Sequence, residues 1–173
     1  IIFGIAKDAG GNIILGLDGG GLIKFDGANF SSIPIPANKP LLRRIQCLYT
    51  DSKGDLLIGT ELNGLWRYHK NSFTPVEGGK NLSIDGISED ADGTVWIATP
   101  FGCFYVGKGN KLFRAEGATA FAFSVLPVGR DSVFIGTHDG LALVVSKRVV
   151  KDFRVDAVNK LAVICLVKYG RDL

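Results

Sequence analysis

Few side chains in this sequence have the type and spacing that catalysis requires. The chain has two histidines, His69 and His138, and no serine lies in a Gly-x-Ser-x-Gly turn that could present a nucleophile. His138 falls in a turn between two predicted strands, where a surface role is the simpler interpretation. The residue types therefore predict no catalytic residues in this segment.

Two Asp-rich or Gly-rich stretches could instead hold an ion or a phosphate. The stretch Asp90–Gly93 is similar to part of a calcium loop, but an EF-hand loop that began at Ser88 would lack its first acid and its bidentate Glu. The stretch Gly19–Gly21 is followed neither by the Lys-Ser/Thr of a P-loop nor by a predicted helix. Both stretches are predicted to be turns, so we expect no metal and no cofactor.

The three cysteines give no sign of a metal site. Cys47, Cys103 and Cys165 show neither C-x-x-C nor Cys/His spacing, and an odd number argues against a disulfide framework. Free cysteine behaves as a small apolar side chain. We expect all three to be buried packing residues.

Composition excludes other classes of function. Lys plus Arg is 20 and Asp plus Glu is 17, and a net charge of +3 is too small a bias for a nucleic-acid surface. No run approaches the ~18 apolar residues of a membrane helix. We therefore expect no nucleic-acid partner and no membrane contact by this segment. The chain contains no Met, and we expect it to be cut from a longer protein.

One short apolar stretch recurs four times and must position whatever chemistry the chain carries. Its copies are Gly11–Leu17, Gly54–Thr60, Gly93–Thr99 and Asp131–Thr137. The small residue near the end of each copy recurs at spacings of 43, 39 and 38 residues. A repeat of roughly 40 residues made of strands is typical of β-propeller blades, and no segment has a helical period. The sequence predicts an all-β fold.

The turns between the strands set the limits of the repeats. We predict four blades of four antiparallel strands, and Leu161–Val167 as the first strand of a fifth blade. The predicted blades cover residues 1–36, 44–77, 83–115 and 122–155, and the partial fifth covers 161–173.

Two columns of the repeat alignment predict how the blades pack. The first strands share a small residue, which close packing near a propeller axis would require: Gly4, Cys47, Gly86, Ser124 and Cys165. The last strands share a phenylalanine that we expect to fill the wide outer part of each blade: Phe30, Phe73, Phe113 and Phe153.

We expect both tryptophans, Trp66 and Trp96, in the core. Trp96 aligns with Ile14, Leu57 and Phe134, so its position is predicted to need bulk and not a particular ring.

The second and third repeats resemble the two-component regulator propeller repeat. The resemblance rests on Ile45–Thr60 with Asn63–Leu65, and on Ile87–Thr99. It implies a seven-bladed propeller in the extracytoplasmic sensor region of a membrane-bound hybrid histidine kinase that responds to polysaccharide fragments. The family pattern is structural and carries no catalytic residues onto this sequence.

From this resemblance we expect a periplasmic, ligand-sensing segment that is not itself an enzyme, although the parent chain would carry a histidine kinase. Its expected partners are an oligosaccharide or other small molecule, the remainder of the propeller and ectodomain, and a second copy through the parent sensor. The ligand is expected on the loop face of the propeller, held by aromatic stacking and polar groups, with the candidate residues Arg44, Glu61, Asn63, Phe101, His138 and Asp139.

Two other functions are alternatives. A propeller enzyme of the streptogramin-lyase type would need a histidine and convergent carboxylates around a divalent metal, and the two histidines here, in unlike repeat positions, give it little support. A scaffold for protein interaction or dimerisation would need none of these.

Overall fold

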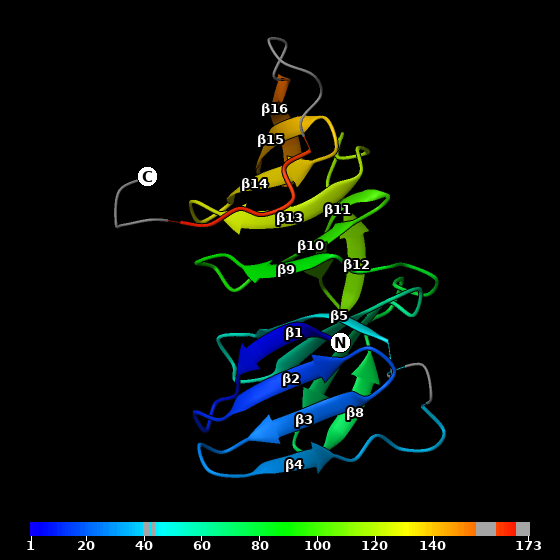
Figure 1. The fold of residues 1–173 in the computed structure, drawn as a ribbon. Helices are drawn as coiled ribbons and strands as arrows, with labels where there is room; N and C mark the ends of the chain where they lie inside the picture. Colours follow the sequence, from blue (N-terminus) through cyan, green and yellow to red (C-terminus); the bar gives the residue numbers. More distant parts are fainter. Residues whose placement is uncertain (40–41, 43, 155–161, 169–173) are drawn as a thin grey trace. The chain divides into compact units, whose positions relative to one another are not determined.

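The described part of the chain is built of β-strands that form four separate sheets. The computed structural model describes residues 1–39, 42, 44–154 and 162–168. The chain divides into two compact units, Ile1–Ile84 and Asp85–Leu173, and each contains two four-stranded antiparallel sheets in which neighbours in sequence are neighbours in space (Figure 1). No described helix is long and apolar enough to cross a membrane.

The first unit contains strands β1 to β8. Its first sheet consists of β1 (Ile2–Lys7), β2 (Ile13–Leu17), β3 (Gly21–Phe25) and β4 (Phe30–Ile33). Its second sheet consists of β5 (Ile45–Thr50), β6 (Leu56–Thr60), β7 (Leu65–His69) and β8 (Ser72–Pro75).

The second unit contains strands β9 to β16. One sheet consists of β9 (Gly86–Glu89), β10 (Val95–Thr99), β11 (Gly102–Gly107) and β12 (Lys111–Arg114). The other consists of β13 (Ala122–Pro127), β14 (Ser132–Thr137), β15 (Gly140–Val145) and β16 (Arg148–Arg154).

An aspartate holds the turn between the first two strands of three sheets. Asp90 Oδ1 accepts the backbone N–H groups of Asp92 at 3.0 Å and Thr94 at 2.9 Å, and Gly93 takes the left-handed φ of 77° that the turn requires. The prediction that Asp90–Gly93 is a turn is confirmed. Asp8 and Asp51 accept bonds from the residues four positions on in the same way.

The first strands pack closely where the sequence places small residues. A Cβ added to Gly4 would lie 2.9 Å from Leu48 Cγ, and one added to Gly16 would lie 2.5 Å from Ile45 Cγ2. No added side chain fits such gaps, so at these glycines the backbone of β1 and β2 packs directly against Leu48 and Ile45 of β5. The predicted close approach of the first strands is confirmed in this unit.

Each unit has a core of buried, mostly apolar side chains. In the first unit the core gathers Ile14, Leu22, Ile45, Leu48, Ile58 and Phe73. In the second it gathers Trp96, Ala98, Cys103, Val125, Ile135 and Val144. Burial of Trp96 is confirmed, but the prediction that its position needs only bulk is wrong, because its Nε1–H donates to the buried carboxylate of Asp90 at 2.8 Å.

The phenylalanine column is only partly buried. Phe73 is buried, whereas the side chains of Phe30 and Phe113 are 68% and 41% exposed. Because β4 and β12 are the last strands of their sheets, these rings cover the rings of neighbouring strands, Phe25 at 4.6 Å and Tyr105 at 5.8 Å between centroids. They do not fill a closed volume.

The predicted strand Leu161–Val167 does not form within the described residues 162–168. Their backbone joins no described sheet, although Val163 N–H donates to Thr137 O at 2.9 Å, much as Ile84 N–H donates to Thr60 O at 3.1 Å. Cys165 lies in this segment and is exposed, and Cys47 is half-buried. Of the three cysteines that we expected to be buried, only Cys103 is.

Candidate functional site

The predicted ligand residues of the first unit form one small group after β6. Arg44 Nη1 donates to Glu61 Oε2 at 2.6 Å, and Asn63 Nδ2 donates to the carbonyl of Glu61 at 2.8 Å. The backbone fixes this group, because Glu61 N–H donates to Arg44 O at 2.9 Å. The structure thus brings these three residues together.

The other three predicted residues lie in the second unit. Phe101, 53% exposed, follows β10, and His138 and Asp139 follow β14, so they occupy corresponding turns of two successive sheets. His138 Nδ1 lies 3.3 Å from Asp139 Oδ1. Asp139 also lines a cavity of about 210 Å³ together with Thr119 and Thr137. That these residues bind a ligand stays a prediction.

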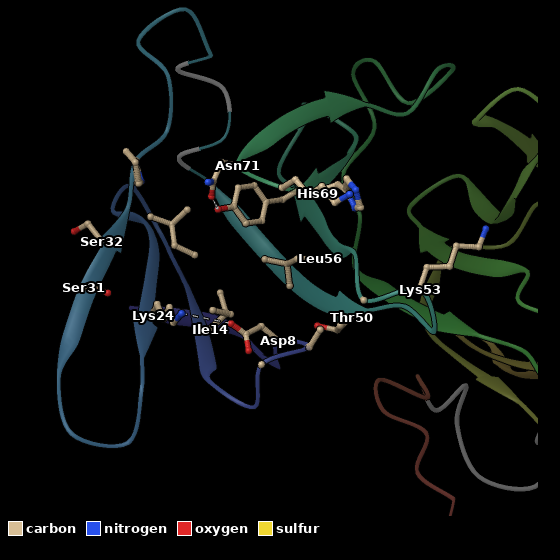
Figure 2. Close-up of a pocket in the computed structure, with 17 residues that line it drawn as sticks. Asp8, Ile14, Lys24, Ser31, Ser32, Thr50, Lys53, Leu56, His69 and Asn71 are labelled. Atoms are coloured by element: carbon tan, nitrogen blue, oxygen red, sulfur yellow. Dashed lines mark hydrogen bonds and ion pairs between the residues drawn. The ribbon is translucent and has the colours of Figure 1, made fainter.

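A larger cavity lies in the first unit, at the opposite ends of the strands. It has a volume of about 510 Å³ and opens between the β1–β4 sheet and the β5–β8 sheet (Figure 2). Its position follows from strand alternation, because the side chains of one cross-strand row in each sheet face this space. The first row is Ile14, Lys24 and Ser31, and the second is Thr50, Leu56 and Tyr68.

The wall from the first sheet carries a pair of opposite charges. Lys24 Nζ lies 3.9 Å from Asp8 Oδ2, as Figure 2 shows. Burial raises the pKa of Asp8, but the hydrogen bonds from Asn12 and from the Gly10 backbone, with the charge of Lys24, outweigh this and leave the pKa below its usual value. Asp8 is therefore a carboxylate at neutral pH.

The wall from the second sheet carries hydroxyl groups. Tyr68 Oη donates to Asn71 Oδ1 at 2.8 Å, and the Tyr68 ring packs against Phe73 with centroids 4.6 Å apart. Thr50 Oγ1 is shielded from solvent and has no hydrogen-bond partner among the residues that the structure describes. A buried hydroxyl without a partner is unfavourable, so Thr50 is a group that a ligand could satisfy.

A charged network lies beside the cavity on the same sheet, and one of its members, His69, also lines the cavity (Figure 2). Arg67 Nη1 donates to Asp51 Oδ2 at 2.5 Å and to Asp55 Oδ2 at 2.7 Å, and Asp55 also contacts His69 Nδ1. Burial of Asp55 raises its pKa, but the bonds from Arg67 and His69 lower it further, so its pKa falls below the usual value. The network fixes the turn between β5 and β6.

A corresponding cavity in the second unit is smaller. It has a volume of about 280 Å³, and its lining includes Asp90, Trp96, Asp131 and Ser146. Two pairs of these already bond to each other: Trp96 Nε1 donates to Asp90 Oδ2, and Ser146 Oγ donates to Asp131 Oδ2 at 2.7 Å. These four side chains are therefore already bonded to one another in pairs.

Sequence reasoning missed the cavity of the first unit. Lys24, Thr50 and Tyr68 are ordinary strand residues, and no motif marks them. The one available signal was the column of Ile14, Leu57, Trp96 and Phe134, in which the first two repeats have an aliphatic side chain where the other two have a ring. Among the described residues no group of three or more His, Cys, Asp and Glu side chains could hold a metal ion.

Comparisons with known proteins identify the repeat. Residues 78–101 match the family model described as two component regulator propeller, which confirms the resemblance seen in the sequence. No curated protein matches the chain.

Solved structures show the same fold. The extracellular domain of a putative hybrid two component system from Bacteroides thetaiotaomicron is 22% identical, with a TM-score of 0.74 over 89% of this chain and 22% of that one. That of a putative one component system from the same organism is 20% identical, with a TM-score of 0.68 over 82% of this chain and 21% of that one.

An enzyme also has this fold. Virginiamycin B lyase from Staphylococcus aureus is 11% identical, with a TM-score of 0.72 over 90% of this chain and 56% of that one. The chain therefore spans about a fifth of the length of the two bacterial extracellular domains. The predicted fold class, an all-β segment of β-propeller blades, is confirmed.

Proposed function

We propose that this chain is part of the extracytoplasmic, ligand-sensing propeller of a two-component regulator. The observation that carries the proposal is the family match at residues 78–101. The likeness to extracellular domains of putative one component and hybrid two component systems supports it through the fold. The segment binds and transmits, and a histidine kinase elsewhere in the parent protein supplies the chemistry.

The ligand we propose is a polysaccharide fragment, and the compartment is the periplasm. The described surface offers polar groups of the kind that bind sugars, both on the turns around Glu61 and His138 and in the cavity beside Lys24. The remaining blades, the rest of the ectodomain and a second copy of the sensor are the proposed protein partners.

Calorimetry of the intact ectodomain against a panel of glycan oligosaccharides tests this function. We expect one class of oligosaccharide to bind, and the same compound to raise kinase-dependent transcription in cells that carry the parent gene. A folded ectodomain that binds no member of a broad panel would refute the proposal.

The likeness to virginiamycin B lyase motivates a second candidate, a propeller lyase. Incubation of the parent protein with virginiamycin B and Mg²⁺, followed by liquid chromatography with tandem mass spectrometry, distinguishes the two, because ring opening by elimination gives an isomer of unchanged mass. Ring opening that is lost in a His69→Ala or His138→Ala variant would favour the lyase over the sensor.

A further inference from the structure

The cavity of the first unit has the lining and the volume that are typical of a small-molecule binding site. Ile14 and Leu56 are buried and give it an apolar floor, while Lys24, Ser31, Thr50 and Asn71 surround that floor with polar groups (Figure 2). A volume of about 510 Å³ lies within the ~300–1,000 Å³ range of small-molecule pockets.

One sheet of the second unit carries rings at the positions that line this cavity in the first unit. Its row Trp96, Tyr105 and Phe113 corresponds to Ile14, Lys24 and Ser31, and successive ring centroids are 5.6 and 5.8 Å apart. The corresponding rows of the other two sheets are Leu57, Arg67 and Thr74, and Phe134, Leu143 and Lys151. The β1–β4 sheet thus lacks the aromatic volume that the repeat carries in the β9–β12 sheet.

We propose that this cavity binds a neutral, hydroxyl-rich small molecule the size of one or two sugar rings. Such a ligand takes the place of the missing rings, and one of its hydroxyls donates to or accepts from Thr50 Oγ1. Its C–H face lies over Ile14, Leu56 and the Tyr68 ring. Its remaining hydroxyls bond to Lys24, Asp8 and Asn71.

Uncharged polar groups favour a neutral ligand, because Ser31, Ser32, Thr50, Tyr68 and Asn71 all line the cavity. Of the charged lining residues, Asp8 and Lys24 face each other, Lys53 points away from the cavity in Figure 2, and Lys70 adds a positive charge. This site lies at the ends of the strands away from Arg44, Glu61 and Asn63. The choice of a saccharide rests on the proposed sensor function, whereas the location rests on the cavity alone.

Two substitutions in the intact protein test the site by calorimetry with neutral mono-, di- and oligosaccharides. Thr50→Val removes one hydrogen bond and keeps the shape, so it should weaken binding about 2- to 10-fold. Ile14→Trp introduces the ring of the second unit and should abolish binding. Lys111→Gln, at an exposed position of β12 in the second unit, should leave the affinity unchanged.

The Thr50→Val variant also guards against a folding artefact. It removes an unpaired buried hydroxyl, so its unfolding midpoint should equal or exceed that of the parent protein. If Ile14→Trp fails to fold, Lys24→Met replaces it, with a weakened affinity as the expected result.

The possible results test the cavity site and the proposed sensor function separately. Saccharide binding that neither Thr50→Val nor Ile14→Trp alters overturns this site and leaves the sensor proposal standing. If no oligosaccharide binds, the sensor proposal falls, and the Leu56 methyl signals in NMR decide the site. Shifts on adding millimolar disaccharide that vanish in Ile14→Trp support it, and unshifted signals overturn it.

Discussion

Replacing Trp96 by Phe isolates a hydrogen bond that holds a turn to the core. Trp96 is 1% exposed, and its Nε1–H donates to Asp90 Oδ2 at 2.8 Å. The other oxygen of Asp90 accepts the backbone N–H groups of Asp92 and Thr94. The indole therefore links the turn between β9 and β10 to the sheet through this hydrogen bond, and a phenylalanine ring has no N–H group to make it.

Two terms set the expected loss of unfolding free energy. A hydrogen bond to a charged group contributes about 1.5–3 kcal/mol, and the carboxylate oxygen is left without this partner. The smaller ring leaves about 40 Å³ empty, which costs about 1 kcal/mol at ~24 cal/mol per Å³. Trp96→Phe should thus destabilise the protein by about 2.5–4 kcal/mol, a large part of a typical domain's stability.

Urea unfolding followed by circular dichroism measures this loss, with the slope m expected to stay constant. Trp66→Phe is the matched control, because Trp66 is half-buried and its Nε1–H donates at 3.0 Å to the neutral carbonyl of Asn63. It should cost about 0.5–1.5 kcal/mol. If the two variants lose the same stability within about 0.5 kcal/mol, the assigned role of the Trp96–Asp90 bond is wrong.

Other parts of the structure give three further predictions. Arg67→Met leaves two buried carboxylates without their cation and should lower the unfolding free energy by about 3–5 kcal/mol in urea titration; a loss below 1 kcal/mol would contradict the network. The folded-state pKa of Asp55 lies below its ordinary value of 3.8. The contribution of Asp55 to the unfolding free energy is therefore complete above pH 3.8 and is lost as the pH falls through the folded-state pKa. Thermal melts from pH 6 to pH 2 should show this loss in the parent protein and a shallower one in Arg67→Met. Burial raises the pKa of Cys103 to about 12, so maleimide at pH 8 should label exposed Cys165 and spare Cys103; labelling at equal rates would be inconsistent with the core.

The strand pattern could be read from the sequence because it depends on local chemistry. The Asp90–Gly93 turn follows from the side chain that bonds its own backbone and from the glycine that takes a positive φ. The small residue Gly4 follows from the lack of space between first strands. Both signals lie within one repeat or one alignment column.

The cavity could not be read in this way, because it depends on the register between strands and on two sheets together. Lys24 lines it only because it pairs with Ile14 and faces Tyr68 across the gap. The bond from Trp96 to Asp90 links a strand to a turn, which a column of bulky residues does not reveal. The exposure of Cys165 depends on a strand that does not form.

The close contact at Gly4 and Gly16 limits the inner strands of a blade but not its outer strands. Leu48 and Ile45 of β5 already lie against these glycines, so no side chain can be added there without moving the sheets apart. Ile14, Lys24 and Ser31 lie on successive strands away from that contact and meet no such limit. Substitutions in this row can therefore resize the space between two blades, from a filled core to an open cavity, while the spacing of the blades stays fixed.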